Sequence, residues 1–439
     1  MRTTTRETGR TGPPPVAMLT WEINPMVAGG SWTACYHFVR NLSRRNAELM
    51  VVAPWREDCV DPDPFGCKVP TALLGVLGHD EGPGLTLASR DGPYRRGPAG
   101  GSPYGAYRPY APGGYGGWAY RPFRGGHGYG GYAAAGEDTD SEAFFDFMRD
   151  ASDRYTDKLL DLARKTPFAL IHAHDWVTFQ AAAEVSRAFG TRWIAHFHSV
   201  ERDRRPWAPD AAVERIERDA AHSADFVVTP SRLTAGCVAQ CYGVPASKIV
   251  VVPNVLSGGA AQPPSGAFAS RRVVFLGRLE SQKAPDRFAQ VAARVRGRDN
   301  GVAFRVFGDG QLRDQLARDG SRLDIRGPLT WNRRWSAFDG AAALLVPSRA
   351  EPFGMVVLEA MQCGVPVLYS SEAGVAEVVT SGIPIDADDV DGTAERVLEL
   401  LADPILWEDV AGAEREEIRS YAERGYERRL LKLYAELRI

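Results

Sequence analysis

The chain has few cysteines, little net charge and no long apolar run, and each shortage excludes a class of protein. Six cysteines in 439 residues are too sparse for a disulfide-stapled secreted scaffold and fit a reducing compartment. No apolar run approaches the roughly 20 residues that span a bilayer, so no transmembrane segment is expected. A formal net charge of −3 argues against a general nucleic-acid binder. We therefore expect a cytoplasmic protein, with peripheral contact to a membrane left open.

Three common catalytic motifs are missing as well. The chain contains no G-x-S-x-G, no G-x-x-x-x-G-K-[ST] and no H-E-x-x-H, which removes the common serine hydrolases, P-loop enzymes and zincins. Residues 1–15 carry arginines, threonines and three consecutive prolines without an apolar core segment. They are predicted to be a disordered tail and not a secretory signal.

Short apolar runs alternate with helical stretches along most of the chain, which predicts two α/β domains, each built on a parallel sheet. The first domain is expected over residues 16–255 and the second over 271–420, with a linker rich in Gly, Pro, Ala and Ser at 256–270. An amphipathic helix is expected over 421–439. The expected strands are 16–20, 49–53, 169–173, 193–197, 226–229 and 249–252, then 273–276, 304–307, 323–325, 343–346 and 366–369.

One segment of the first domain has a different composition. Residues 91–132 consist largely of Gly, Tyr, Pro and Arg, and no acidic residue occurs between Asp91 and Glu137. Without periodicity the segment cannot bury a core of its own, so a mobile inserted loop is the plain interpretation. A lid or an aromatic platform for a second substrate, and an RGG-like nucleic-acid contact, are the alternatives.

The most informative stretch is Pro347 to Met361, which places two carboxylates eight positions apart across a strand-to-helix junction. A helix is predicted to start near Phe353, where the first backbone N–H groups have no intrahelical partner and favour an anion such as a phosphate. Glu351 would lie before that terminus and Glu359 inside the helix, each able to accept from hydroxyl groups. The arrangement fits a sugar–diphosphate–ribose ligand; an N-cap glutamate and a solvated helix glutamate are the plain alternative.

Further polar residues, together with two glycines and a tryptophan, follow other expected strands, and the carboxyl ends of parallel strands are where open α/β sheets bind ligands. These residues are Gly29 and Gly30; His172, His174, Asp175 and Trp176; His196, His198 and Glu201; Arg278 and Lys283; and Asp309. The paired histidines could ligate zinc, or be buried structural residues, but no cysteine or carboxylate completes a recognisable zinc spacing. No metal site is therefore predicted. Arg278 and Lys283 would neutralise a leaving diphosphate, unless they are plain surface charges.

Taken together, these motifs resemble the glycosyltransferase family 4 enzymes of the GT-B fold, from Val16 onward. The resemblance rests on Gly29-Gly30, His172-Ala-His174-Asp175-Trp176, His196 to Glu201, Val251 to Asn254, Phe275 to Leu279 with Lys283, Gly308 to Leu312, and Glu351 with Glu359. The histidine region is most similar to the glycogen-synthase-like branch. The fold so implied is two Rossmann-like parallel-sheet domains that face a central cleft, with the last helix crossing back to the first domain.

The resemblance also implies roles for particular residues. The donor, a nucleotide-diphosphate sugar with UDP-sugars favoured, would be bound by Gly30, Arg278, Lys283, Asp309, Phe353, Gly354, Met355, Val356 and Glu359. The catalytic residues would be His198, Glu351, Arg278 and Lys283. The hydroxyl acceptor, a small molecule, glycan or lipid-linked sugar, would contact Gly29, Trp32, His174, Asp175 and Glu201.

The implied reaction is a metal-independent, cofactor-free retaining hexosyl transfer by a front-face mechanism, in a monomer or homodimer. A sugar-nucleotide 2-epimerase or a sugar phosphorylase on the same fold, and a non-catalytic sugar-nucleotide-binding protein, are the alternatives. The chain departs from the family pattern at Ser31-Trp32, where small residues are usual, and at Val255 to Ser257, which replaces Gly-Val-Asp. Acceptor specificity is expected near Trp32 and the insert.

Overall fold

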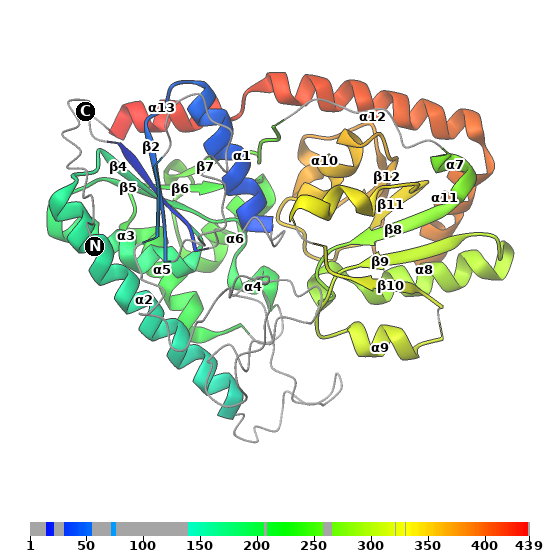
Figure 1. Cartoon of the computed structure of the whole chain (residues 1–439), viewed down its shortest axis with the longest axis horizontal. Coiled ribbons are helices and arrows are strands. Elements are labelled where there is room, and N and C mark those ends of the chain that lie inside the picture. The colour runs from blue at the N-terminus through cyan, green and yellow to red at the C-terminus, as the bar shows by residue number, and fades with distance from the viewer. Residues whose placement is uncertain are drawn as a thin grey trace, which may run out of the picture.

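The computed structural model of the chain describes residues 15–21, 30–54, 72–75, 139–205, 209–257, 266–320, 322–329 and 331–437. They form two α/β domains side by side, each with helices packed on both faces of a central sheet (Figure 1). The expected tail up to residue 14, Gly29, the insert 91–132 and linker residues 258–265 lie outside the described residues. The side chain of Trp32 lies outside them too.

The first domain is built on a seven-stranded parallel sheet in the order β3-β2-β1-β4-β5-β6-β7. Its strands are β1 Val16–Leu19, β2 Leu49–Ala53, β3 Ala72–Gly75, β4 Leu170–His174, β5 Trp193–His196, β6 Phe226–Thr229 and β7 Ile249–Val251. Its helices are α1 Gly30–Arg44, α2 Thr139–Lys165, α3 Trp176–Phe189, α4 Glu201–Arg204, α5 Ala211–Ser223 and α6 Arg232–Tyr242, followed by the 3₁₀ turn η3 Ala246–Lys248.

The second domain is built on a six-stranded parallel sheet in the order β10-β9-β8-β11-β12-β13. Its strands are β8 Arg272–Leu276, β9 Ala303–Phe307, β10 Asp324–Gly327, β11 Ala343–Val346, β12 Val367–Ser370 and β13 Ile383–Ile385. Its helices are α7 Ala267–Ser270, α8 Pro285–Arg298, α9 Arg313–Arg318, α10 Met355–Gln362, α11 Val390–Ala402 and α12 Pro404–Arg424, with 3₁₀ turns η4 Ser281–Lys283, η5 Trp331–Ala337 and η6 Gly374–Glu377.

The central strands are continuous apolar runs because helices cover both faces of each sheet. Strands β1, β2 and β11, for example, are buried at every position. Such runs made the strands visible in the sequence, and the predicted parallel α/β fold is confirmed, with half of the predicted strand ends shifted by one or two residues. The edge strands β3 and β13 were not predicted.

The C-terminal region differs from the single helix expected over residues 421–439. Helix α12 extends to Arg424 and ends at Gly425, which adopts a left-handed conformation with φ 61°. Helix α13 then runs from Glu427 to Leu437 and lies on the first domain, while α12 lies along the second (Figure 1). Tyr421 belongs to the second domain's core, so the crossing lies at residues 425–426.

Helix α13 packs on the first domain through an apolar stripe at helical spacing: Leu430, Leu433, Tyr434 and Leu437 join the cluster that contains Phe38 and Leu42 of α1. The carboxylate of Glu427 pairs with Arg45 at 2.5 Å. Among the described helices, none is both long and apolar enough to cross a membrane.

In both sheets the strand order reverses beside the first strand, between β1 and β4 and between β8 and β11. A crevice opens at such a point beyond the carboxyl ends of the strands, because the following loops diverge to opposite sides. The loops after β8 and β11 carry Arg278, Lys283 and Glu351, and the loop after β4 carries Asp175. The topology therefore brings these four predicted residues to the two switch points, whereas His198 and Glu201 follow β5 and Asp309 follows β9.

Candidate functional site

The loop after β8 is held by close backbone packing against the loop after β9. A Cβ atom added to Gly308 would lie 1.8 Å from the carbonyl oxygen of Gly277, and one on Gly310 would lie 2.6 Å from that of Leu279. The backbone N–H of Leu279 donates to Asp309 at 2.8 Å. Only glycine permits this approach, so the G-x-G pair fixes the segment that carries Arg278 and Lys283.

Lys283 lies directly against Glu351. Its Nζ donates to both carboxylate oxygens, at 2.7 and 2.6 Å, and the hydroxyl of Ser348 donates to the same carboxylate at 3.0 Å. The Glu351 side chain is 5% exposed, whereas that of Lys283 is 22% exposed. The ion pair therefore opens to solvent on its lysine side, where an anionic ligand can share the cation.

Arg278 is directed at its own loop instead. Its guanidinium donates to the side-chain oxygen of Gln282 at 2.7 Å. The carbonyl oxygen of Gln282 accepts from the backbone of Arg349, and the Arg349 side chain makes a two-fold contact with Asp286 at 3.0 and 2.6 Å. These contacts join the loops after β8 and β11 into one unit; Gln282, Ser348 and Arg349 were not singled out in the sequence.

Residues 351–354, here called the Glu351 loop, lead into helix α10. Gly354 is the N-cap with φ 108°, a conformation that disfavours residues with a side chain, and the helix begins at Met355. The predicted start near Phe353 is two residues early. Glu359 thus lies just over one turn inside α10, and the amide groups of Met355 and Val356 belong to its first turn, where N–H groups lack intrahelical partners.

Glu359 is buried and faces a cation that the sequence did not reveal. Its carboxylate lies 3.6 Å from the guanidinium of Arg334 in η5, and both side chains are about nine-tenths buried. Burial raises the pKa of Glu359 to about 7, although Arg334 opposes the shift. Arg334 also lies over the ring of Trp335, with 4.3 Å from its Cζ to the ring centroid. Glu359 is therefore poised between its two protonation states near neutral pH.

The four histidines form two hydrogen-bonded pairs stacked on each other. Nε2 of His172 lies 3.1 Å from Nδ1 of His196, and Nδ1 of His174 lies 2.8 Å from Nε2 of His198. The pairs stack, with ring centroids 4.5 Å apart for His172 and His174 and 4.4 Å for His196 and His198. Burial is the largest cause that lowers the pKa of each imidazole.

This geometry disfavours the zinc alternative. The nitrogens of His172, His174 and His196 lie within 4.8 Å of one another, which is close enough to consider an ion. However, both nitrogens of His172 are engaged, with Nδ1 2.6 Å from the hydroxyl of Tyr434 and Nε2 on His196. Stacked, nearly parallel rings also direct their lone pairs along separate planes and not toward one point. Coordination by all three imidazoles would require His172 to give up one of its two contacts.

Tyr434→Phe is expected to destabilise the protein by about 1–2 kcal/mol, because His172 would retain a buried ring nitrogen without its hydroxyl partner. Urea unfolding followed by circular dichroism measures the change. A matched comparison is Tyr155→Phe, which removes a bond to the carbonyl oxygen of Val52, a group that also lies in the β1–β2 ladder. Equal unfolding midpoints for wild type and Tyr434→Phe would contradict the assigned contact.

Asp175 links the loops after β4 and β5. It has φ 59° and ψ 166°, a backbone region that residues other than glycine rarely occupy. The conformation is held because its N–H donates to His196 at 2.9 Å and its carboxylate accepts from the backbone N–H of His198 at 2.8 Å. Such strain is common at functional sites, and here it fixes the backbone of His198.

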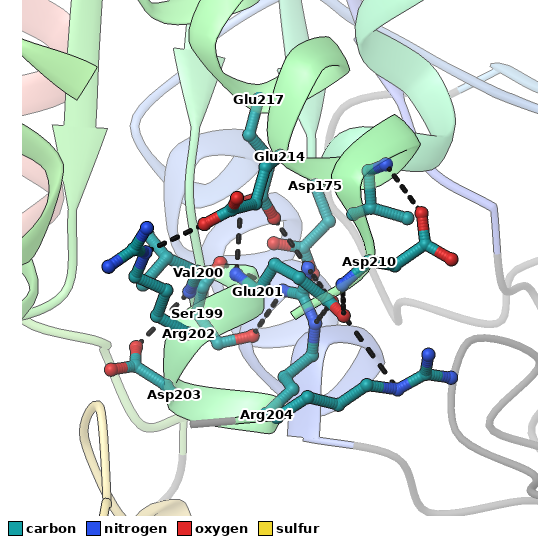
Figure 2. A network of polar contacts seen from close by, with 12 residues as sticks. Asp175, Ser199, Val200, Glu201, Arg202, Asp203, Arg204, Asp210, Glu214 and Glu217 are labelled. Atoms are coloured by element: carbon teal, nitrogen blue, oxygen red, sulfur yellow. Dashed lines mark hydrogen bonds and ion pairs between the residues drawn. The ribbon is translucent and has the colours of Figure 1, made fainter. Parts of the chain in front are cut away.

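Glu201, predicted to contact an acceptor, lies in a buried ionic network (Figure 2). Arg204 donates to Glu201 at 3.0 Å and also pairs with Glu217, which accepts from the backbone N–H of Glu201 at 2.9 Å. The second oxygen of Glu201 accepts from the backbone of Asp210 at 3.1 Å. With both oxygens engaged, Glu201 shapes the α4–α5 connection, and its acceptor role stays a prediction.

Glu280 is a further acidic residue that sequence reasoning missed. Burial raises its pKa to about 7, against Arg278 and Arg205, while the charge of Asp309 adds to the shift. Asp309 itself is buried and lies 3.6 Å from Arg313. The sequence signal was the place of Glu280 between the two predicted cations, Arg278 and Lys283. A single glutamate near a lysine cannot, however, be told from a surface charge in the sequence alone.

Two family models match the chain. The model described as "Glycosyl transferases group 1" matches residues 270–403, and "Glycosyltransferase Family 4" matches residues 142–256. The first match covers most of the second domain, and the second covers the first domain from α2 to just beyond β7.

Curated relatives agree with these matches. Glycogen synthase of Mycobacterium tuberculosis (strain CDC 1551 / Oshkosh) is 27% identical over 271 residues, covering 57% of this chain and 64% of the relative. The D-inositol 3-phosphate glycosyltransferase of Nocardiopsis dassonvillei is 26% identical, covering 54% of this chain and 63% of the relative. The chain thus spans slightly less than two thirds of the length of these relatives.

Solved structures share the fold over nearly the whole chain. Sucrose-phosphate synthase from Thermosynechococcus elongatus superposes with a TM-score of 0.67 at 17% identity, covering 97% of this chain and 99% of that one. Anabaena HepE in complex with UDP and glucose superposes with a TM-score of 0.63 at 14% identity, covering 96% and 99%. With two glycosyltransferase domains in this order on a GT-B fold, the chain belongs to the family 4 glycosyltransferases.

Proposed function

We propose that this chain is a retaining glycosyltransferase that transfers a hexose from a nucleotide-diphosphate sugar to a hydroxyl acceptor. The observation that carries the proposal is the arrangement at the β8/β11 switch point, where Lys283 and Glu351 touch and α10 begins. A cation, a helix N-terminus and buried carboxylates match the charges and hydroxyls of such a donor. HepE, solved with UDP and with UDP-glucose, supports uridine nucleotides as the first donors to test.

In this proposal Lys283, Arg278 and the first amides of α10 bind the diphosphate, Glu351 accepts from sugar hydroxyls, and Glu359 accepts from the ribose. The acceptor oxygen bonds to the anomeric carbon on the face from which the phosphate leaves. The leaving phosphate oxygen takes the acceptor's proton. His198, whose backbone is held by Asp175, would face this centre from the first domain.

The test is a thermal-shift screen with uridine, adenosine and guanosine diphosphate sugars, followed by transfer assays with the donor that stabilises the protein most. Carbon NMR of the product reports whether the anomeric configuration is retained. Release of free sugar nucleotide with an inverted C2 would indicate a 2-epimerase, and dependence on inorganic phosphate would indicate a phosphorylase. Stabilisation by a donor without any turnover would indicate a binding protein.

Transfer is expected to proceed without a divalent ion, because Lys283, Arg278 and the α10 terminus supply the positive charge that a metal otherwise provides. Activity after dialysis against EDTA should therefore equal the untreated activity. Loss of activity that Mg²⁺ or Mn²⁺ restores would contradict metal independence. Loss restored only by Zn²⁺ would point back to the histidine array.

A further inference from the structure

The Glu351 loop is held by three successive carbonyl groups. The carbonyl oxygen of Glu351 accepts from the N–H of Gly374 at 2.9 Å, and that of Phe353 accepts from the N–H of Val375 at 2.7 Å. Both donors lie in η6 of the same domain. The carbonyl oxygen between them, on Pro352, accepts instead from the hydroxyl of Ser231 at 2.7 Å and, at 3.4 Å, from that of Thr234. The middle anchor of the loop is thus supplied by the first domain.

Ser231 is placed for this contact because it is the N-cap of α6. Its hydroxyl oxygen accepts from the N–H of Thr234 at 3.1 Å while the hydroxyl hydrogen points to Pro352. Both Ser231 and Thr234 are fully buried, so the junction excludes water. One hydroxyl therefore caps a helix and binds the other domain's loop at the same time.

A second contact joins α6 to η6 of the second domain, and here too the first domain supplies the hydrogen-bond donors. The carboxylate of Glu377, at the end of η6, accepts from the backbone N–H groups of Arg232 at 2.9 Å and Leu233 at 3.0 Å. The first turn of α6 contains no acidic residue of its own. A carboxylate of the second domain thus complements the positive end of a first-domain helix.

Gly374, where α6 and the Glu351 loop meet η6, leaves no room for a side chain. A Cβ atom added to Gly374 would lie 2.1 Å from the carbonyl oxygen of Pro352 and 2.7 Å from Cβ of Ser231. Three segments, α6, η6 and the Glu351 loop, therefore meet at this glycine. Such close fitting distinguishes the junction from an incidental contact of two surfaces.

We propose that Ser231 and Glu377 form an interdomain latch that positions the Glu351 loop for donor binding when the two domains close. The proposal rests on the proposed function in assigning the donor to this loop. Both latch residues act through the loop and not on the donor itself. Because the latch bonds exist only while α6 touches η6, closure and donor affinity are linked, and each must favour the other.

Ser231→Ala and Glu377→Gln test the latch. Each is expected to weaken UDP-glucose binding about five- to tenfold, because each substitution removes one of the hydrogen bonds between α6 and the second domain and so shifts the population toward domain arrangements in which the loop is held less firmly. Isothermal titration gives the affinity, and steady-state kinetics should show a raised donor KM. Small-angle scattering of the ligand-free variants should show a larger radius of gyration than that of the wild type.

Asp403→Ala is the matched control. Its carboxylate also accepts from two helix N–H groups, those of Ile405 at 2.8 Å and Leu406 at 3.2 Å, but within the second domain. It should lower the melting temperature without changing donor affinity or scattering. If the wild type binds UDP-glucose and the double variant Ser231→Ala/Glu377→Gln keeps that affinity and the wild-type radius, the latch is refuted. If the wild type binds no nucleotide sugar, the proposed function fails, while scattering still decides whether the latch holds the domains together.

Discussion

Replacing Lys283 by alanine is expected to lower the rate of sugar transfer by about 10²- to 10³-fold, the size of effect seen when one preorganised charge is removed from a developing anion. Nζ of Lys283 is the cation that sits on Glu351, on the solvent side of the pair. When the diphosphate leaves, this cation is already in place to stabilise the new negative charge, so no reorganisation of solvent or ions is needed. Its loss should therefore lower kcat as well as donor affinity.

The measurement is kcat and KM for the donor chosen by the thermal-shift screen. Lys248→Ala is the control, since that lysine donates to the carbonyl oxygen of His222 in the first domain, away from the site. Because Lys283→Ala leaves the buried Glu351 without its cation, the melting temperatures of Lys283→Ala and of Lys283→Ala/Glu351→Gln show how much stability the unpaired carboxylate costs. Turnover like that of the wild type in a folded Lys283→Ala would sink the site assignment.

Glu359→Gln is expected to weaken donor binding about 10- to 100-fold at pH 8 and to remove its pH dependence. A carboxylate accepts from ribose hydroxyls more strongly than a neutral amide does. Since burial raises the pKa of Glu359 to about 7, most Glu359 side chains are ionised above that pH and most are protonated below it. The wild type should therefore lose about tenfold in affinity between pH 8 and pH 6, and the variant should not.

The free energy of unfolding should change with pH in the opposite direction to donor affinity, which gives a second, independent test of the role of Glu359. The pKa of Glu359 in the folded state is above its ordinary value of 4.5, so the unfolded chain releases this proton first as the pH rises. The stabilisation is present below about pH 4.5 and is lost as the pH rises toward 7. Relative to the wild type, Glu359→Gln should thus become more stable as the pH increases. UDP-glucose titrations and urea unfolding at pH 6 and 8 measure both; a wild-type affinity that is flat with pH would refute the role.

Local patterns in the sequence predict which residues form the candidate site, but they do not predict which of those residues touch. Glu351, Glu359, Arg278 and Lys283 were named from spacing and from strand-end positions. The sequence could not show that Lys283 rests on Glu351, 68 positions away, or that Arg334 faces Glu359. The sequence pairs the histidines along each strand, and in the structure these pairs are stacked. The hydrogen bonds run between the strands instead, from β4 to β5.

The C-terminal helix shows the same limit at a boundary. Its amphipathic pattern predicted that it would pack, and the family resemblance predicted a return to the first domain. The break at Gly425 was missed because α12 and α13 are both helical on either side of a single left-handed residue. The packing of Tyr421 in one core and of Tyr434 in the other then assigns the two helices to different domains.

By itself the sequence determined the two parallel-sheet domains, the family and the residue types at the strand ends, because apolar runs, glycines and charges at strand ends are local patterns. The tertiary structure alone decided which of those residues touch: Lys283 on Glu351, His172 on Tyr434, and Ser231 of one domain on Pro352 of the other. These contacts join segments between 68 and 262 positions apart. No local pattern encodes them, because they depend on which strands lie side by side in each sheet and on how the two domains and the returning helix are brought together.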